Sequence, residues 1–165
     1  RQLVNYPSYT DRIGSTLSII SGLMPGIMVP VNIFLHGVFY LYLVVEWFRS
    51  KGKGENGFIW TAFLTLVITN LVAYRTATPH YVALIAPLFL ISRVMEERWG
   101  KSGRWVSSLM YVVIFVGLWM LFLTTVQGVD EQAVMYVPVP FLILIFMWWM
   151  RWWMMRPITA YFDSK

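Results

Sequence analysis

Residues 27–48 read IMVPVNIFLHGVFYLYLVVEWF, and this stretch decides the fold. Only Asn32, His36 and Glu46 interrupt an otherwise apolar run. A helix of this length is about 33 Å long, enough to cross a bilayer core of about 30 Å with some tilt. The stretch therefore predicts a transmembrane helix.

Four further apolar stretches follow, so we expect an all-α polytopic membrane protein. Its five predicted spans cover residues 27–48, 57–74, 79–95, 105–126 and 133–155. The third is short for a full crossing and carries Pro87 inside. Residues 17–26 are too short to cross and end in Pro-Gly, which favours an interfacial segment. We expect a single membrane domain over 1–165, with 1–26 as an outer polar and interfacial segment.

The composition excludes the main alternatives to a membrane protein. The chain is 58% hydrophobic and only 13% charged, against about 25% charged in an ordinary soluble domain. The absence of cysteine excludes disulfide-stapled folds and thiolate metal sites. The 13 Lys and Arg residues are dispersed over the loops, so no contiguous basic face forms and we expect no nucleic-acid partner.

The basic residues also predict the orientation in the membrane. Ten of the 13 lie in loops 48–57 and 93–104 and in the tail 151–165. The other three, Arg1, Arg12 and Arg75, lie on the opposite side of the predicted spans. Because basic loops stay in the cytoplasm, we expect the N terminus outside and the C terminus in the cytoplasm.

Two features are predicted at the cytoplasmic boundary. Residues 147–155, MWWMRWWMM, place four Trp around Arg151. We interpret this as an interfacial anchor whose guanidinium snorkels to the headgroups. Glu46 lies one turn from the end of the first span, and we expect it to form an interfacial ion pair rather than a proton relay.

His36 is a candidate ligand within the first span. A neutral imidazole there would suit a haem iron or a chlorophyll magnesium, or would hydrogen-bond a neighbouring helix. The only second histidine, His80, lies at the outer end of the third span. We therefore discount a haem held by two histidines.

The outer loop at residues 73–81, AYRTATPHY, gathers two potential cations, Arg75 and His80, beside Tyr81. A guanidinium binds phosphate oxygens through two parallel hydrogen bonds, and the helix expected from Pro79 adds free amides. The loop therefore predicts a site for a lipid phosphate or diphosphate. The alternative is an Arg that snorkels to headgroups and a His that caps a helix.

No other motif predicts catalysis or a metal. Asp130 and Glu131 are adjacent acids in a short outer loop, which are usually solvated and offer too few ligands for a divalent cation. No Walker, HExxH or GxSxG pattern occurs. We expect no metal site and no catalytic residue in this chain.

Residues 63–94, FLTLVITNLVAYRTATPHYVALIAPLFLISRV, resemble the later transmembrane region of GT-C type, polyprenyl-phosphate-sugar-dependent glycosyltransferases. Those proteins often show an apolar span, a short outer loop, a His-Tyr pair, a proline and then a basic cytoplasmic loop. His80-Tyr81 and Pro87 occupy these positions here. The resemblance implies lipid-phosphate contacts at Arg75, His80 and Tyr81, and a bacterial or archaeal cytoplasmic membrane.

The resemblance also implies that the chain is not catalytic by itself. That superfamily carries its catalytic acid in the first outer loop of a longer chain, and no residue here matches it. The chain begins with Arg1 rather than Met, so we expect it to be processed or to be part of something longer. The resemblance implies that it is the C-terminal part of such a transferase.

A second hypothesis is a non-catalytic structural or assembly subunit of a larger membrane complex, photosynthetic or respiratory. Its partners would be lipids and other membrane subunits, and His36 would be a pigment ligand. Visible absorbance would distinguish it from a colourless transferase fragment. The sequence identifies no cofactor, sugar donor or acceptor.

Overall fold

The structure is a computed structural model that describes residues 16–17, 25–73, 78–125 and 137–155. Within these ranges all regular structure is helical. The elements are η2 Pro25–Ile27, α3 Met28–Ser50, α4 Gly54–Val72, η3 Thr78–Leu84, α5 Ile85–Trp99, α6 Lys101–Thr125 and α7 Pro138–Met154.

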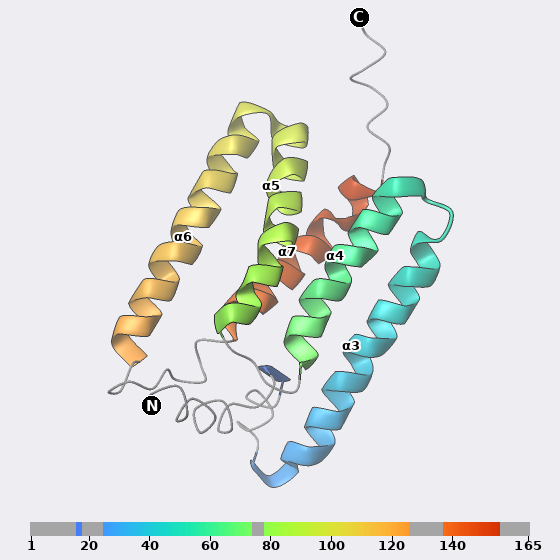
Figure 1. Cartoon of the computed structure of the whole chain (residues 1–165), viewed down its shortest axis with the longest axis vertical. Helices are drawn as coiled ribbons and strands as arrows, with labels where there is room; N and C mark the ends of the chain where they lie inside the picture. The colour runs from blue at the N-terminus through green and yellow to red at the C-terminus, as the bar shows by residue number, and fades with distance from the viewer. Residues whose placement is uncertain (1–15, 18–24, 74–77, 126–136, 156–165) are drawn as a thin grey trace, which may run out of the picture.

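Successive long helices run in alternating directions (Figure 1). α4, α5 and α7 pack against one another at the centre, α3 packs on α4 and α6 packs on α5. Gly100, with φ +57°, separates α5 from α6. A glycine suits this position because an L side chain is strained at such a backbone angle. The result is a bundle with two flanking helices.

The core lies among the three central helices. Trp60, Leu64 and Ile68 of α4 are fully buried. They belong to one cluster with Ile91 of α5 and Met147 of α7. Bulky apolar side chains from three helices therefore hold the centre together by dispersion and close packing.

The outward faces of the flanking helices are also apolar. The exposed large side chains of these faces include Ile33, Phe34 and Leu41 on α3, and Val112, Phe115 and Trp119 on α6. Such extensive apolar surface is unfavourable in water but matches lipid. α3, α4 and α6 are each long and apolar enough to cross a membrane. The architecture thus indicates a membrane-embedded protein.

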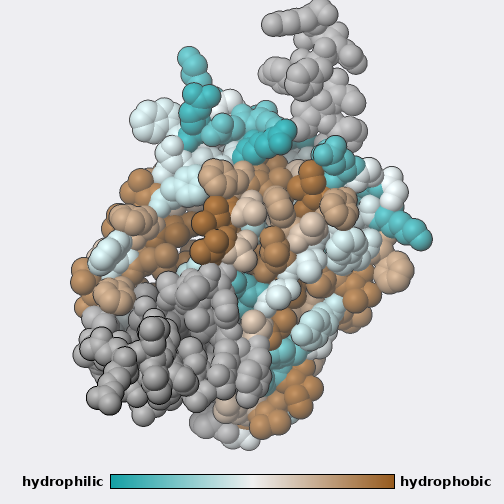
Figure 2. All heavy atoms as spheres, viewed as in Figure 1, coloured by the Kyte–Doolittle hydropathy of each residue, from teal (hydrophilic) through white to brown (hydrophobic). Residues whose placement is uncertain are grey.

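Charged residues gather at one end of the bundle, which we call the charged end. It comprises the C-terminal parts of α3, α5 and α7, the starts of α4 and α6, and the two turns between them (Figure 1). Every Lys, Arg and Glu of the described ranges lies there: Glu46, Arg49, Lys51, Lys53, Glu55, Arg93, Glu96, Glu97, Arg98, Lys101, Arg104 and Arg151. Hydrophilic surface accordingly collects at the top of Figure 2, above the apolar flank.

The expected spans match the helices unequally. Spans 27–48, 57–74 and 105–126 correspond to α3, α4 and α6, which are long enough to cross. Span 79–95 differs, because its first residues form the 3-10 helix η3 and the helix continues past Met95 to Trp99.

Span 133–155 also differs, because α7 begins only at Pro138 and is 17 residues long. A proline removes a backbone donor, a loss that costs least in the first turn of a helix. The outer segment 1–26 lies almost wholly outside the described residues.

Candidate functional site

A buried ion pair lies at the charged end. Glu46 is only 1% exposed, and its Oε2 accepts a hydrogen bond from Arg151 Nε at 2.6 Å. Arg49 Nη1 contacts the other carboxylate oxygen at 3.5 Å. The prediction of an ion pair at Glu46 is thus confirmed. The snorkelling expected of Arg151 is wrong, because its guanidinium turns inward to α3 and its side chain is only 22% exposed.

Opposite charge explains why Glu46 tolerates burial. A carboxylate taken out of water loses its hydration, and the two guanidinium groups replace part of it. The Tyr42 hydroxyl, one turn earlier on α3, is buried without a hydrogen-bond partner. This cluster joins helices and, among the residues that the structure describes, contains no second carboxylate, so it suits a structural role better than proton transfer.

Some tryptophans of residues 147–155 pack against α5, and others are exposed. Trp153 and Trp149 of α7 pack against Trp99 of α5, with ring centroids 5.4 and 5.9 Å apart. Arg98 Nη2 donates to the Trp153 carbonyl at 2.9 Å, satisfying an acceptor near the helix end. Trp148 is exposed, as an interfacial anchor would be. The anchor segment therefore also ties α7 to α5.

His36 is partly buried on α3. Its Nδ1 lies 2.8 Å from the Asn32 carbonyl oxygen, one turn earlier on the same helix. Because a carbonyl only accepts, the tautomer of a neutral imidazole that makes this contact has its proton on Nδ1 and a lone pair on Nε2. This hydrogen bond lies within α3, whereas one of the two predicted alternatives was a hydrogen bond to a neighbouring helix. The free lone pair is compatible with a ligand.

The predicted outer corner is described only in part. Arg75 lies outside the described residues, and of His80 the structure gives the backbone, within η3. Tyr81 is partly buried and packs against the core. The start of η3 lies at the end of the bundle opposite the charged end (Figure 1). Whether Arg75 and His80 share one cavity stays a prediction.

Metal ligation finds no support in the described ranges. They contain no group of three or more His, Asp or Glu residues that would hold a metal ion. Asp130 and Glu131 lie outside those ranges.

Two features of the charged end were missed by sequence reasoning. The first is the Glu46–Arg151 pair, which joins positions 105 residues apart. The second is residues 52–57, GKGENG, a G-x-G-x-x-G pattern that covers the end of the α3–α4 turn and the first four residues of α4. The signal was visible in the sequence, although here a helix precedes it, whereas a strand precedes the dinucleotide-binding fingerprint.

Comparisons with protein-family models, curated proteins and solved structures found no significant match. The class of protein thus rests on its own fold: an all-helical chain, within the part described, with three helices able to cross a membrane.

Proposed function

We propose that this chain is the membrane-embedded C-terminal part of a GT-C-like lipid-linked sugar transferase. It holds the phosphate of a polyprenyl-phosphate sugar at Arg75, His80 and Tyr81, and does not transfer the sugar by itself. The chain crosses the membrane five times, with the N terminus outside and the charged end in the cytoplasm. Its partners are lipids and the catalytic part of the enzyme.

The separation of charge carries this proposal. Among the described residues, Lys and Arg occupy one end of the bundle, which favours a cytoplasmic location for that end. Tyr81 belongs to η3, which begins at the other end (Figure 1). The predicted phosphate-binding loop would then face the outer side, where a lipid-linked sugar donor is used in the family that the sequence resembles.

The alternating helix directions support five crossings. η3 and α5 run without a break from Thr78 to Trp99. At rises of about 2.0 Å and 1.5 Å per residue, this unit is roughly 36 Å long, sufficient to cross. α7 is shorter, about 25 Å, and its tryptophans would fix its end at the headgroups.

Lipid retention by the purified full chain tests the site. Native mass spectrometry would measure binding of a long-chain polyprenyl phosphate, with the uncharged polyprenol as reference. Arg75→Ala should weaken binding by about tenfold or more, since a hydrogen bond to a charged group contributes about 1.5–3 kcal/mol. Arg75→Lys should bind between the two, because it keeps the charge and loses the planar fork.

Arg104→Ala is the matched control, because Arg104 is exposed at the charged end. It should bind like the unmodified chain. Equal retention by all four proteins, or equal binding of the polyprenol, would refute a phosphate site at Arg75.

One observation favours the second candidate, a structural subunit of a larger membrane complex. His36 keeps Nε2 available while Nδ1 is held by the Asn32 carbonyl, the arrangement that metal-ligating histidines use. A pigment on His36 would give visible absorbance that is lost in His36→Leu. The transferase proposal predicts that the chain stays colourless when haem or chlorophyll is supplied.

A further inference from the structure

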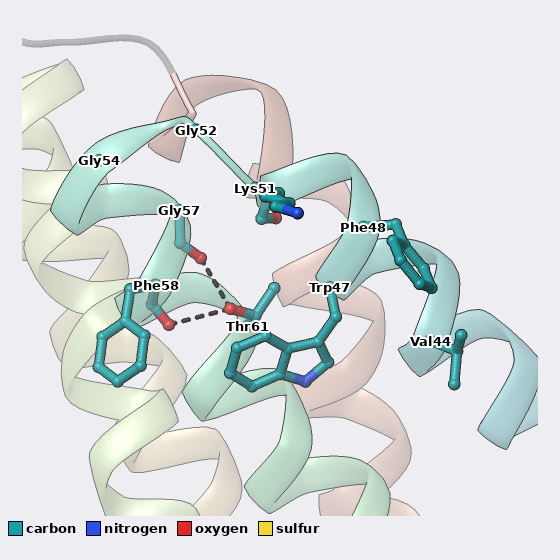
Figure 3. A pocket seen from close by; sticks show the side chains of 10 residues that line it. Val44, Trp47, Phe48, Lys51, Gly52, Gly54, Gly57, Phe58 and Thr61 are labelled. Carbon is teal, nitrogen blue, oxygen red and sulfur yellow. Dashed lines mark hydrogen bonds between the residues drawn. The ribbon is translucent and has the colours of Figure 1, made fainter.

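A groove opens between the end of α3 and the start of α4. Its volume is about 710 Å³, within the range of about 300–1,000 Å³ found for small-molecule sites. The lining residues are Val44, Trp47, Phe48, Ser50, Lys51, Gly52, Gly54, Gly57, Phe58 and Thr61 (Figure 3). Nearly all of its walls are apolar, and it lies at the charged end.

The walls of the groove are held in place by local contacts. The Trp47 indole Nε1 donates to Thr65 Oγ1 at 3.1 Å and its ring packs edge-on against Phe58 at 6.3 Å. The Thr61 hydroxyl donates to the Gly57 and Phe58 carbonyls (Figure 3). A Cβ at Gly57 would meet the Ser50 carbonyl oxygen at 2.9 Å. The glycine thus lets α3 and α4 approach closely at the groove.

The mouth of the groove, unlike its walls, offers donors. Lys51 is exposed there, above the rings of Trp47 and Phe58 (Figure 3). Ser50 is only 7% exposed, and its hydroxyl is buried without a hydrogen-bond partner. A buried hydroxyl without a partner is costly, so a ligand acceptor at this point would satisfy it.

The turn itself adds backbone donors. Gly52 and Gly54 have φ angles of +83° and +68°, and α4 begins with no side-chain cap. The first amides of a helix lack carbonyl partners, and glycine lets an anion approach them closely. The G-x-G-x-x-G pattern of residues 52–57 therefore places uncapped amides next to Lys51 and Ser50.

We propose that this groove binds an anionic phospholipid. Its phosphate lies at Lys51, the Ser50 hydroxyl and the start of α4, and its acyl chain follows Val44, Trp47 and Phe58 into the bilayer. Donors at the mouth together with apolar walls favour a lipid over a free anion, because phosphate alone would leave the apolar walls of the groove uncovered. Two carboxylates lie nearby: Glu46 is paired with Arg151, and Glu55, in the first turn of α4, is exposed to solvent and does not line the groove.

Native mass spectrometry of the full chain tests the proposal with phosphatidylglycerol, and with phosphatidylcholine of the same acyl chains as reference. Lys51→Gln and Ser50→Ala should each weaken phosphatidylglycerol binding by at least fivefold. Val44→Trp should do the same by filling the apolar wall. Phosphatidylcholine should bind more weakly than phosphatidylglycerol to the unmodified chain.

Two matched controls separate this site from the surface in general. Lys101→Gln removes the same charge at the same end, and Val45→Trp adds the same bulk on α3 beside the groove. Both should bind phosphatidylglycerol normally. Equal losses in Lys51→Gln and Lys101→Gln, unchanged binding in Val44→Trp, or full competition by inorganic phosphate would each overturn the proposal. Arg75→Ala should still bind phosphatidylglycerol. Failure of the outer polyprenyl-phosphate site would therefore not count against lipid binding in this groove.

Discussion

Arg151 Nε donates to Glu46 Oε2 at 2.6 Å and joins α7 to α3 at the charged end. These two helices make few other contacts, because α3 packs mainly on α4. The pair therefore links α3 directly to α7, together with the edge-on contact between the Phe39 and Phe141 rings at 6.2 Å. Glu46 is the one buried acid of the described ranges, and Arg151 balances its negative charge.

Breaking this pair should destabilise the chain strongly. Arg151→Met leaves a buried carboxylate without its closest partner and should lower the free energy of unfolding by about 3–5 kcal/mol. Glu46→Gln/Arg151→Met should recover much of that loss, because neither charge remains unpaired. Equilibrium unfolding in mixed micelles measures both. As a control, Arg93→Ala breaks the exposed Arg93–Glu97 pair and should cost about 1 kcal/mol or less.

Gly103 should not tolerate a side chain. A Cβ there would collide with the backbone carbonyl of Met95 on α5, across the turn between α5 and α6. Gly103→Ala should therefore cost about 1–3 kcal/mol or more through overpacking. Gly117→Ala on the same helix meets nothing within 4 Å and should be neutral or stabilise slightly. Thermal unfolding in detergent compares the two, and equal midpoints would contradict the packing of this turn.

A hydrogen bond between α5 and α6 should contribute modestly. Ser92 Oγ donates to the Tyr111 hydroxyl at 2.7 Å. Tyr111→Phe should cost about 0.5–1.5 kcal/mol, near the lower end if the pair lies in lipid. Thr124→Val is the control, because the Thr124 hydroxyl donates to Met120 on its own helix. A loss in Thr124→Val as large as that in Tyr111→Phe would mean that the interhelical bond adds nothing.

Sequence reasoning predicted the long apolar helices well. Span 27–48 is α3, Met28–Ser50, because a long apolar run is readable from composition alone. The end of α5 was less predictable. Residues 93–98 are rich in charge, which resembles a loop, yet they continue the helix until Gly100 ends it.

The pairing of helices was not predictable in the same way. Apolar runs predict which residues form helices, but they do not predict which helices pack against each other. The sequence therefore placed Arg151 at the headgroups, whereas in the structure it pairs with Glu46 of another helix. The candidate site has a different difficulty. Arg75 and His80 were chosen from a short motif, and the structure describes no side chain at either position.

The proposed lipid-phosphate site at Arg75 requires that the charged end of the bundle faces the cytoplasm and the opposite end faces the outside. Because the chain contains no cysteine, single cysteines can be introduced without background. Lys53→Cys and Ser102→Cys lie at exposed positions of the charged end, and Gln132→Cys falls between α6 and α7 in the sequence, where we expect an outer loop. A membrane-impermeant thiol reagent applied from outside should label Gln132→Cys alone, and should label the other two only after permeabilisation. Labelling of Lys53→Cys and Ser102→Cys from outside in sealed membranes would contradict a cytoplasmic charged end and, with it, an outer site at Arg75.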